Sequence, residues 1–91
     1  MLIPEYTNKF QSDLSLMQKR GRDIKKLKAV IEKLVNEDVP LPAKNRDHKL
    51  IGDYADNREC HIEPDWLLVY YYADSVIVFA RTGTHSDIFR K

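Results

Sequence analysis

The N-terminal part of the chain carries apolar residues at the spacing of an amphipathic helix. They recur at i, i+4 and i+7 and are Phe10, Leu14 and Met17. Steps of three and four residues place side chains on one face of a helix. Thr7 is a residue type that caps helix N-termini, and Gly21 is a residue type that ends helices. The pattern therefore predicts a helix from Thr7 to about Arg20.

A second apolar stripe follows directly. Its members are Ile24, Leu27, Ile31, Leu34 and Val35. Most lysines of this segment lie off the stripe, and Pro40 and Pro42 end the helix because proline has no backbone N–H to donate. Two amphipathic helices joined by a tight turn form a hairpin. The shared apolar side of that hairpin needs a sheet to cover.

Shorter segments predict the strands of that sheet. Residues 1–5 begin apolar and suit a short strand near an edge. Asn57 to Glu63 alternates between its two faces, whereas Trp66 to Tyr72 is apolar or aromatic on both. A strand that is apolar on both faces is typical of the covered centre of a sheet. A turn at 74–75 leads into a last strand from Val76 to Thr82.

The order of these elements is one strand, two helices and a run of antiparallel strands. This order predicts an α+β fold with a single domain over residues 1–91. Leu50 and Tyr54 flank Gly52 in a segment that is either a short strand or the arm before a turn.

The last part of the chain contains one conflict and one motif. Strict alternation places the charged Arg81 on the same face as the apolar Ile77 and Phe79. A charged residue on an apolar face is a local conflict, and such conflicts often mark functional residues. Thr84 stands three residues before Asp87, which resembles a capping box with Asp in place of the usual Glu or Gln. The motif predicts a short terminal helix.

Composition narrows the class of protein. With 43% hydrophobic and 32% charged residues in a chain of 91, we expect a folded globular domain with a modest core. The longest apolar run, Trp66 to Ala73, is too short to cross a bilayer, and the N-terminus lacks the pattern of a secretory signal. The single Cys60 excludes an internal disulfide and a cysteine-pair zinc site. These features predict a cytoplasmic protein with no membrane partner.

The net charge of +1 hides a segregation of charge along the chain. From Lys19 to Lys49 there are ten Lys and Arg against five Asp and Glu, and from Asp53 to Asp74 there is one Arg against six acidic residues. The basic part is either a solvated helix face or a surface for phosphates. As a surface for phosphates, its cations are Lys19, Arg20, Arg22, Lys25, Lys26, Lys28, Lys44 and Arg46.

Groups that move protons or hold charge gather between two predicted strands, from His61 to Trp66. The end of a strand is where a rigid sheet presents side chains to a ligand. His48 and His85 lie well away in the sequence and are flanked by polar or turn residues. If the fold brings the three histidines together, this segment is a functional site. If it does not, the segment is a polar turn.

Four segments carry a likeness to a known family. They are Leu-Pro-Ala at 41–43, Asp-His-Lys-Leu at 47–50, and the longer stretches 58–70 and 81–89. Together they resemble the YafQ branch of the RelE-type toxins, the toxin halves of bacterial type II toxin–antitoxin pairs. The motifs His-x-x-Pro-Asp-Trp from His61 and Arg-Thr-Gly-Thr-His from Arg81 are specific when they occur together.

The resemblance implies a RelE-like microbial RNase fold. In that fold a two-helix hairpin packs on a small, mainly antiparallel sheet of four or five strands, and a short helix ends the chain. It also implies a ribosome-dependent endoribonuclease that cuts messenger RNA in the 30S A site without a metal or cofactor. The implied partners are the ribosome with its mRNA and a ribbon-helix-helix antitoxin like DinJ or RelB. Operator DNA is implied only through the complex with that antitoxin.

The residues that match the functional positions of the family are His48, His61, Asp65, Arg81, His85 and Phe89. Cutting RNA through its own 2′-hydroxyl requires a base, an acid and a cation on the phosphate. In our assignment His85 is the general acid and Arg81 contacts the scissile phosphate, because a guanidinium binds phosphate with two parallel hydrogen bonds. Either His61 or Asp65 is the base, and the other orients it or tunes its pKa.

The remaining candidates have supporting roles in this assignment. His48 holds a neighbouring phosphate or shares in proton transfer, and Phe89 stacks on an unpaired base. The sequence departs from the family at Tyr54 and Asp56, where the resemblance leads us to expect Trp and Gly.

Three other functions are compatible with these residues. A metal-dependent nuclease would use His48, His61, His85 and Asp65 as zinc or nickel ligands, although the chain has no tight pair such as His-x-x-x-His. A non-catalytic interaction toxin like those of the ParE branch would need no histidine cluster. An inactive relative would act only as a co-repressor with its antitoxin. At the level of single residues, Arg81 could serve only to pair with an acidic group.

Overall fold

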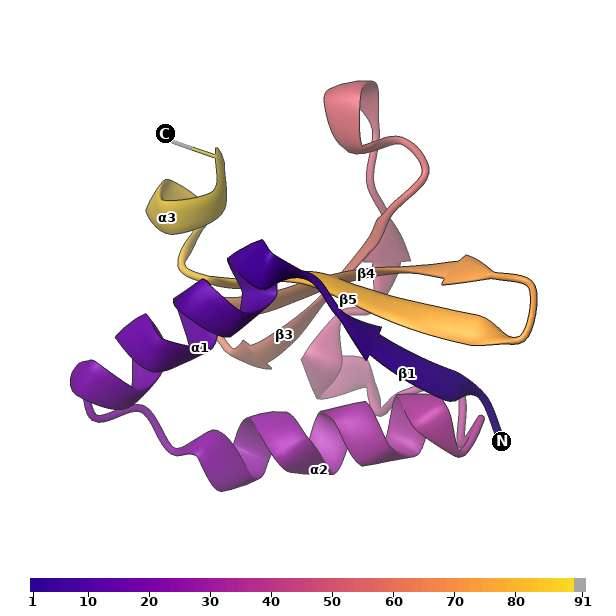
Figure 1. Ribbon diagram of the computed structural model, residues 1–91, viewed down its shortest axis with the longest axis horizontal. Coiled ribbons are helices and arrows are strands. Elements are labelled where there is room, and N and C mark those ends of the chain that lie inside the picture. Colours follow the sequence, from indigo (N-terminus) through magenta and orange to yellow (C-terminus); the bar gives the residue numbers. More distant parts are fainter. Residues whose placement is uncertain (90–91) are drawn as a thin grey trace.

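The computed structural model describes residues 1–89, apart from the side chain of residue 53 (Figure 1). Its helices are α1 (Asn8–Lys19), α2 (Ile24–Val35) and α3 (His85–Phe89). Its strands are β1 (Ile3–Tyr6), β2 (His48–Lys49), β3 (Arg58–Glu63), β4 (Trp66–Ala73) and β5 (Val76–Gly83). They form a five-stranded sheet in the order β1-β5-β4-β3-β2, in which only β1 and β5 pair in parallel. The predicted α+β fold is confirmed.

The ends of the helical hairpin follow from local hydrogen bonds. The Thr7 hydroxyl accepts the Phe10 N–H at 3.0 Å at the start of α1. Gly21 has a φ of 79°, and the N–H of Arg22 reaches back to the Met17 carbonyl at 3.0 Å. This pairing closes the helix in a Schellman motif, for which glycine has no steric cost. Asp23 then caps α2 through the N–H of Lys25. The tight turn expected between the two helices is therefore confirmed.

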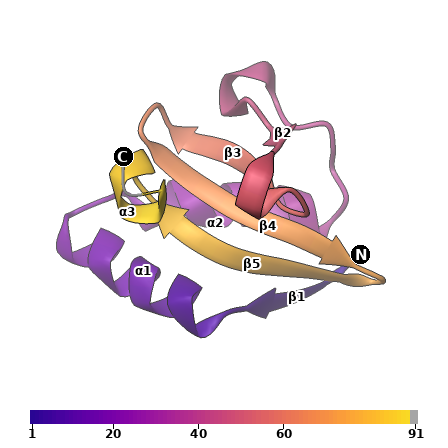
Figure 2. The ribbon, with the colours of Figure 1, turned by 90° about the horizontal axis from the view of Figure 1, so that it is seen from above.

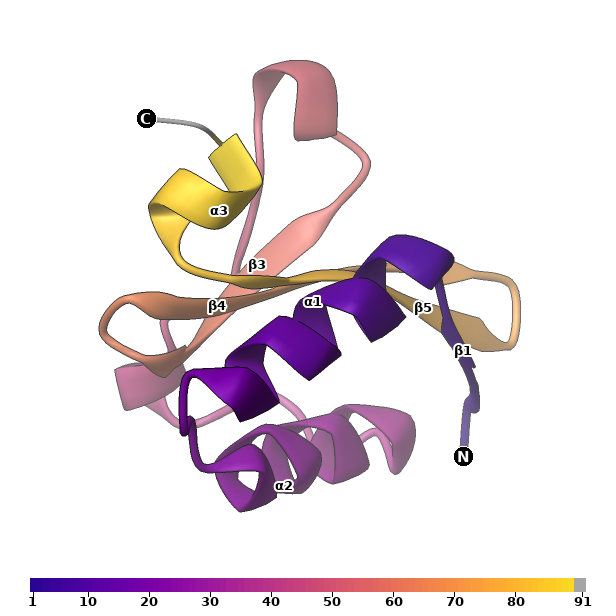
Figure 3. The same cartoon turned by 60° about the vertical axis from the view of Figure 1, so that its left-hand side comes forward.

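The two faces of the sheet carry different layers. Figure 3 shows α1 and α2 below the sheet and α3 above it. The hairpin face buries the main core, in which Met17 and Leu34 pack with Trp66 and Phe79. On the other face, Ile88 of α3 packs against Leu67 and Val69. Because Trp66 to Tyr70 are fully buried, β4 is the covered central strand that its sequence predicts as far as Tyr70. Beyond it the cover predicted as far as Tyr72 is missing, since Tyr72 is 47% exposed.

A β-bulge in β5 decides where Arg81 points. Tyr70 pairs with Phe79 and Val69 pairs with Arg81, so Ala80 is an extra residue without a partner in the ladder. Residues directly opposite each other in two strands project to the same face. Arg81 therefore shares the face of Val69, and the prediction that it shares the face of Phe79 is wrong. The bulge turns the guanidinium away from the hairpin core to the face that carries α3.

The segment around Gly52 forms a 3-10 turn that follows a short edge strand. Residues His48–Lys49 form the short edge strand β2, and Gly52–Tyr54 then form a 3-10 turn. Figure 1 shows this turn raised above the sheet on the same side as α3. The loop between α2 and β2 contains a further 3-10 turn at Ala43–Asn45. Among the described residues, no helix has the length and apolar character needed to cross a membrane.

Candidate active site

Four elements meet at one end of the sheet. Figure 2 shows α3 lying over the sheet where β5 ends and where β3 turns into β4. Two of the three histidines come close together there, because the rings of His61 and His85 are 5.9 Å apart between centroids. Asp65 lies in the turn between β3 and β4 and contacts His85. The fold therefore assembles residues that are about twenty positions apart in the sequence, as a site requires.

The terminal capping box fixes the position of His85. The N–H of Asp87 donates to the Thr84 hydroxyl at 3.1 Å, and the N–H of Thr84 donates to the Asp87 carboxylate at 2.9 Å. This reciprocal pairing confirms the predicted capping box. It places His85 in the first turn of α3, where its backbone N–H and its Nδ1 both face Asp65 Oδ1, at 3.3 and 2.9 Å.

The pairing with His85 also sets the charge state of Asp65. The hydrogen bonds from the His85 side chain and backbone lower the pKa of the Asp65 carboxyl below its usual range. Asp65 is therefore ionised at neutral pH. An ionised carboxylate accepts only, so the Nδ1 of His85 carries the hydrogen, and Nε2 is the nitrogen left for chemistry.

His61 is buried and its tautomer is set by the backbone. Its Nδ1 lies 3.1 Å from the Pro64 carbonyl oxygen, and only 7% of the residue is exposed. Because a carbonyl only accepts, the hydrogen sits on Nδ1 and the Nε2 of a neutral His61 is an acceptor. This nitrogen lies on the side of Glu59, 3.6 Å from its carboxylate. In this tautomer Nε2 is the ring nitrogen that could accept a proton, as a general base does.

Glu59 is a member of the site that the sequence analysis missed. The residue is 5% exposed, and its carboxylate lies between His48 Nε2 at 3.4 Å and His61 Nε2 at 3.6 Å. The sequence held part of the signal, because alternation along the strand puts Glu59 and His61 on one face. The pairing of His48 with Glu59 in the ladder is visible only in the structure. His48 is therefore joined to the site through Glu59 and not by contact with His85.

Three residues of the site have the donor set of a metal ligand cluster. One ligand atom each from Glu59, His61 and His85 lie within 4.8 Å of one another. Two imidazoles and a carboxylate suit zinc, copper or nickel. This set differs from the one expected from the sequence, because Glu59 takes the place of both His48 and Asp65.

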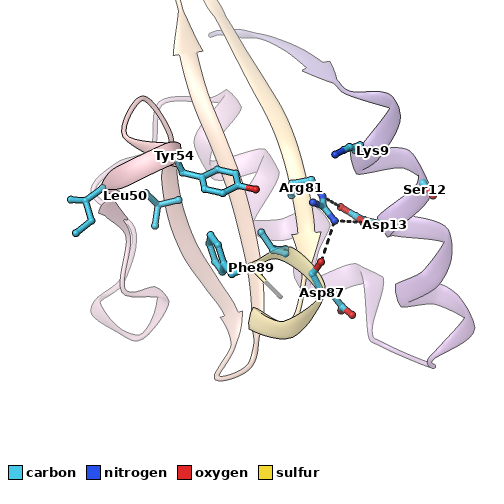
Figure 4. Close-up of a pocket in the computed structure, with 10 residues that line it drawn as sticks. Lys9, Ser12, Asp13, Leu50, Tyr54, Arg81, Asp87 and Phe89 are labelled. Atoms are coloured by element: carbon cyan, nitrogen blue, oxygen red, sulfur yellow. Dashed lines mark hydrogen bonds and ion pairs between the residues drawn. The ribbon is translucent and has the colours of Figure 1, made fainter. Parts of the chain in front are cut away.

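Arg81 lies apart from the histidines, on the wall of a pocket of about 720 Å³ (Figure 4). Its guanidinium donates to Asp13 through Nε at 2.7 Å and Nη2 at 3.2 Å, and Nη2 also reaches the Asp87 carbonyl at 3.5 Å. The hydrogen bonds to Asp13 raise the pKa of Arg81. Arg81 therefore pairs with an acidic group, as one interpretation of the sequence expected. Nη1 is the part of the fork that these contacts do not use.

Phe89 connects the histidines to this pocket. Its ring centroid is 6.4 Å from His85 on one side and 5.3 Å from Tyr54 on the other, where the two rings meet edge to face. The pocket and the histidine pair are thus neighbours on the same face of the sheet.

The predicted basic surface divides into two groups. Arg20 binds Asp87 with two hydrogen bonds, and Arg22 and Lys26 both bind Glu63. Lys26 and then Arg22 lower the pKa of Glu63. These three cations tie the hairpin to the site end of the sheet. Within the described part of the chain, the ion pairs leave five of the predicted cations unpaired, and these are Lys19, Lys25, Lys28, Lys44 and Arg46.

Comparisons with known proteins identify the family of this chain. Residues 2–90 match the family described as the bacterial toxin of type II toxin–antitoxin systems, YafQ. The chain is 44% identical over 85 residues to the mRNA interferase toxin YafQ of Escherichia coli K12, covering 93% of this chain and 92% of the relative.

Solved structures agree with the sequence match. The toxin in the E. coli DinJ–YafQ complex is 42% identical, with a TM-score of 0.91 and coverage of 98% of this chain and 99% of that one. A metal-bound toxin from Helicobacter pylori is also 42% identical, with a TM-score of 0.90 and coverage of 98% and 100%.

Proposed function

The chain belongs to the YafQ family of bacterial toxins of type II toxin–antitoxin systems, and on that premise we propose that it is an mRNA interferase. The proposed activity is ribosome-dependent endonucleolytic cleavage of mRNA in the A site. The observation that carries this proposal is the pairing of two histidines with different partners, Asp65 for His85 and Glu59 for His61. Two titratable groups in different environments are what acid–base catalysis requires.

The proposed reaction starts at the 2′-hydroxyl of the RNA. His61 takes the proton of this hydroxyl on Nε2, and the 2′-oxygen forms a bond to the adjacent phosphorus. The bond from phosphorus to the 5′-oxygen breaks, and His85 gives a proton from Nε2 to that oxygen. The products are a 2′,3′-cyclic phosphate and a free 5′-hydroxyl. Each well-placed proton transfer typically contributes about 10²–10⁴-fold to the rate.

The surrounding residues support these two transfers. Asp65 holds the His85 ring through Nδ1, which leaves Nε2 directed to the substrate, so we assign Asp65 an orienting role and not that of the base. Glu59 lies between His48 and His61 and stabilises the positive charge that His61 gains. Arg81 stabilises the phosphate through Nη1 while Asp13 holds the rest of its fork.

The partners follow from the same premise. A DinJ antitoxin is bound to YafQ in the E. coli complex, and we propose that a ribbon-helix-helix antitoxin binds this chain. Operator DNA would then be bound only by the toxin–antitoxin complex. The unpaired cations of the basic surface would contact ribosomal RNA, and that association would weaken as salt concentration rises.

The test is cleavage of an mRNA in vitro with and without programmed ribosomes, in the presence of EDTA. We expect cuts only with ribosomes, and we expect His85→Gln to lose about 10²-fold or more of the rate because the leaving group is no longer protonated. Lys49→Gln is the control, since Lys49 is an exposed cation outside the site and should cut like wild type. Intact mRNA with folded wild-type protein would overturn the nuclease function and favour a non-catalytic toxin.

A second candidate is a metal-dependent nuclease that uses the same cluster. The closeness of donor atoms from Glu59, His61 and His85 favours it, and a related H. pylori toxin is described as metal-bound. A bound ion would supply Lewis-acid stabilisation of charge on the phosphate. The EDTA arm separates the two candidates, because chelation abolishes cleavage by a metal-dependent enzyme and leaves acid–base cleavage intact.

A further inference from the structure

The pocket beside Arg81 has two unlike walls, and of the residues that line it the proposed reaction uses only Arg81. One wall is apolar and is made by Tyr54 of the raised turn, by Leu50 and Ile51 just before that turn, and by Phe89 of α3. The opposite wall is polar and is made by Lys9, Ser12 and Asp13 of α1. Figure 4 shows the Tyr54 and Phe89 rings on one side of the space and the α1 side chains on the other.

The apolar wall offers aromatic surface to a ligand. The Tyr54 and Phe89 rings meet edge to face at 5.3 Å, which is a favourable geometry for two aromatic rings. Ile51 is 89% exposed next to them, so this wall carries apolar surface that the fold itself does not bury. Apolar and aromatic surface left in a pocket is typical of a site that a flat, apolar group enters.

The polar wall offers hydrogen-bonding groups that are held in place. Asp13 accepts from Arg81 and from the Thr82 N–H at 3.1 Å, so its carboxylate is held in place on this wall. Lys9 stands at the first turn of α1, and within the described residues no ion pair engages its ammonium group. The rings of the apolar wall suit the flat face of a nucleobase, which stacks on aromatic side chains. The acceptor Asp13 and the donor Lys9 on the opposite wall suit its polar edge.

The position of the pocket relates it to the cleaved bond. Phe89 lies 6.4 Å from His85 by ring centroids and also forms part of the pocket wall. Arg81 projects into the pocket from the sheet. A nucleotide whose phosphate lies between His85 and Arg81 therefore has its neighbouring base within reach of the space beyond Phe89. The volume of about 720 Å³ is ample for one nucleotide, since small-molecule sites span roughly 300–1,000 Å³.

We propose that this pocket binds an unpaired nucleobase of the RNA next to the cleaved bond, with Tyr54 as its stacking surface and Lys9 and Ser12 as its polar edge. The inference rests on the proposed nuclease function and adds a subsite for the substrate. The subsite would make cleavage depend on the base that enters it, because the polar edge pairs well with some bases and leaves others unsatisfied.

Binding to the free protein is the first test. The isotopically labelled toxin is titrated with adenosine 5′-monophosphate and, separately, with ribose 5-phosphate, and backbone amide shifts are followed by NMR. We expect the nucleotide to shift the amides of Tyr54, Lys9 and Ser12 and the sugar phosphate to leave them unmoved. Equal shifts with both probes would show a phosphate site at Arg81 without a base subsite, and no shift at these three residues with either would overturn the proposal.

Cleavage by pocket variants is the second test. Tyr54→Ala should lower kcat/KM on programmed ribosomes about five- to a hundredfold, the range that corresponds to the loss of one base stacked on an aromatic ring. Tyr54→Trp should restore most of it, because the stacking surface returns. Tyr72→Ala is the matched control, since Tyr72 is 47% exposed and lies outside the pocket.

Specificity separates a subsite from a structural role. With mRNAs that differ in one base beside the cut, Lys9→Gln should change the ratio of kcat/KM between the bases. A folding defect would lower all rates equally, and that outcome would overturn the subsite. If wild type cut no mRNA, the nuclease function would fail, whereas the nucleotide titration would still report on the pocket.

Discussion

Asp65 and His85 show how a single contact can define the role of a catalytic candidate. The contact is a hydrogen bond of 2.9 Å between side chains that are both largely exposed, 64% for Asp65 and 49% for His85. An exposed pair of this kind adds little to stability. The contact instead positions a side chain, because it holds the His85 ring in one orientation with the hydrogen on Nδ1.

Replacing Asp65 with Asn should therefore affect the rate and leave the fold intact. We expect Asp65→Asn to lower kcat for mRNA cleavage about ten- to a hundredfold, a part of the roughly 10²–10⁴-fold that a well-oriented acid contributes. The measurement is single-turnover cleavage on programmed ribosomes, with circular dichroism as a check of folding. Asp74→Asn is the control, because Asp74 lies in the turn between β4 and β5 with a φ of 56°, which Asn tolerates. Equal losses in both variants would contradict the orienting role.

At the scale of elements, α3 is a short helix that carries a catalytic candidate. It is held by the capping box, by the packing of Ile88 and by two hydrogen bonds from Arg20 to Asp87. The Arg20 guanidinium holds the pKa of the Asp87 carboxyl well below its usual range. The position of His85 thus depends on α1 as well as on its own turn.

This pairing predicts how stability changes with acid. Because the folded-state pKa of Asp87 is depressed, its stabilising contribution is complete above the unfolded pKa of about 4 and is lost as the pH falls through the folded pKa. The free energy of unfolding of wild type should exceed that of Asp87→Asn by a constant amount above about pH 5. The difference should shrink steadily below pH 4. Urea unfolding at a series of pH values measures it, and a difference that grows in acid would contradict the assignment.

At the scale of the whole molecule, the two faces of the sheet divide stability from function. The hairpin face holds the main core, and the α3 face holds the candidate site and the pocket. Core substitutions on the hairpin face should therefore act on stability and spare the chemistry.

Leu34→Ala tests this division. Leu34 is fully buried, so its truncation should cost about 2–5 kcal/mol of unfolding free energy, a large part of the roughly 5–15 kcal/mol typical of a domain. At a temperature where the variant is still folded, kcat should stay near wild type. Leu16→Ala is the matched control, because Leu16 is 39% exposed and its truncation should cost much less. A loss of kcat in the folded Leu34 variant would show that the two faces are coupled.

The sequence by itself determined the parts of this protein that depend on neighbours along the chain. The boundaries of the first helix, the stop at Gly21, the capping box at Thr84 and the covered strand from Trp66 are local patterns of period and capping, and the structure confirms them. The second helix ends at Val35, before the prolines expected to end it. The family likeness rests on the same kind of local information, because its motifs are contiguous. The comparisons confirm it.

Only the tertiary structure decided what depends on register and on the meeting of distant segments. The bulge at Ala80 reverses the face of Arg81, because one extra residue shifts every later side chain of a strand to the other side. His48 joins the site only through the pairing of β2 with β3, which brings it beside Glu59. Asp13 meets Arg81 across sixty-eight positions of the chain. Such contacts depend on how distant segments pack in three dimensions. The periodicity of a sequence reports only on neighbours along the chain, so it cannot predict them.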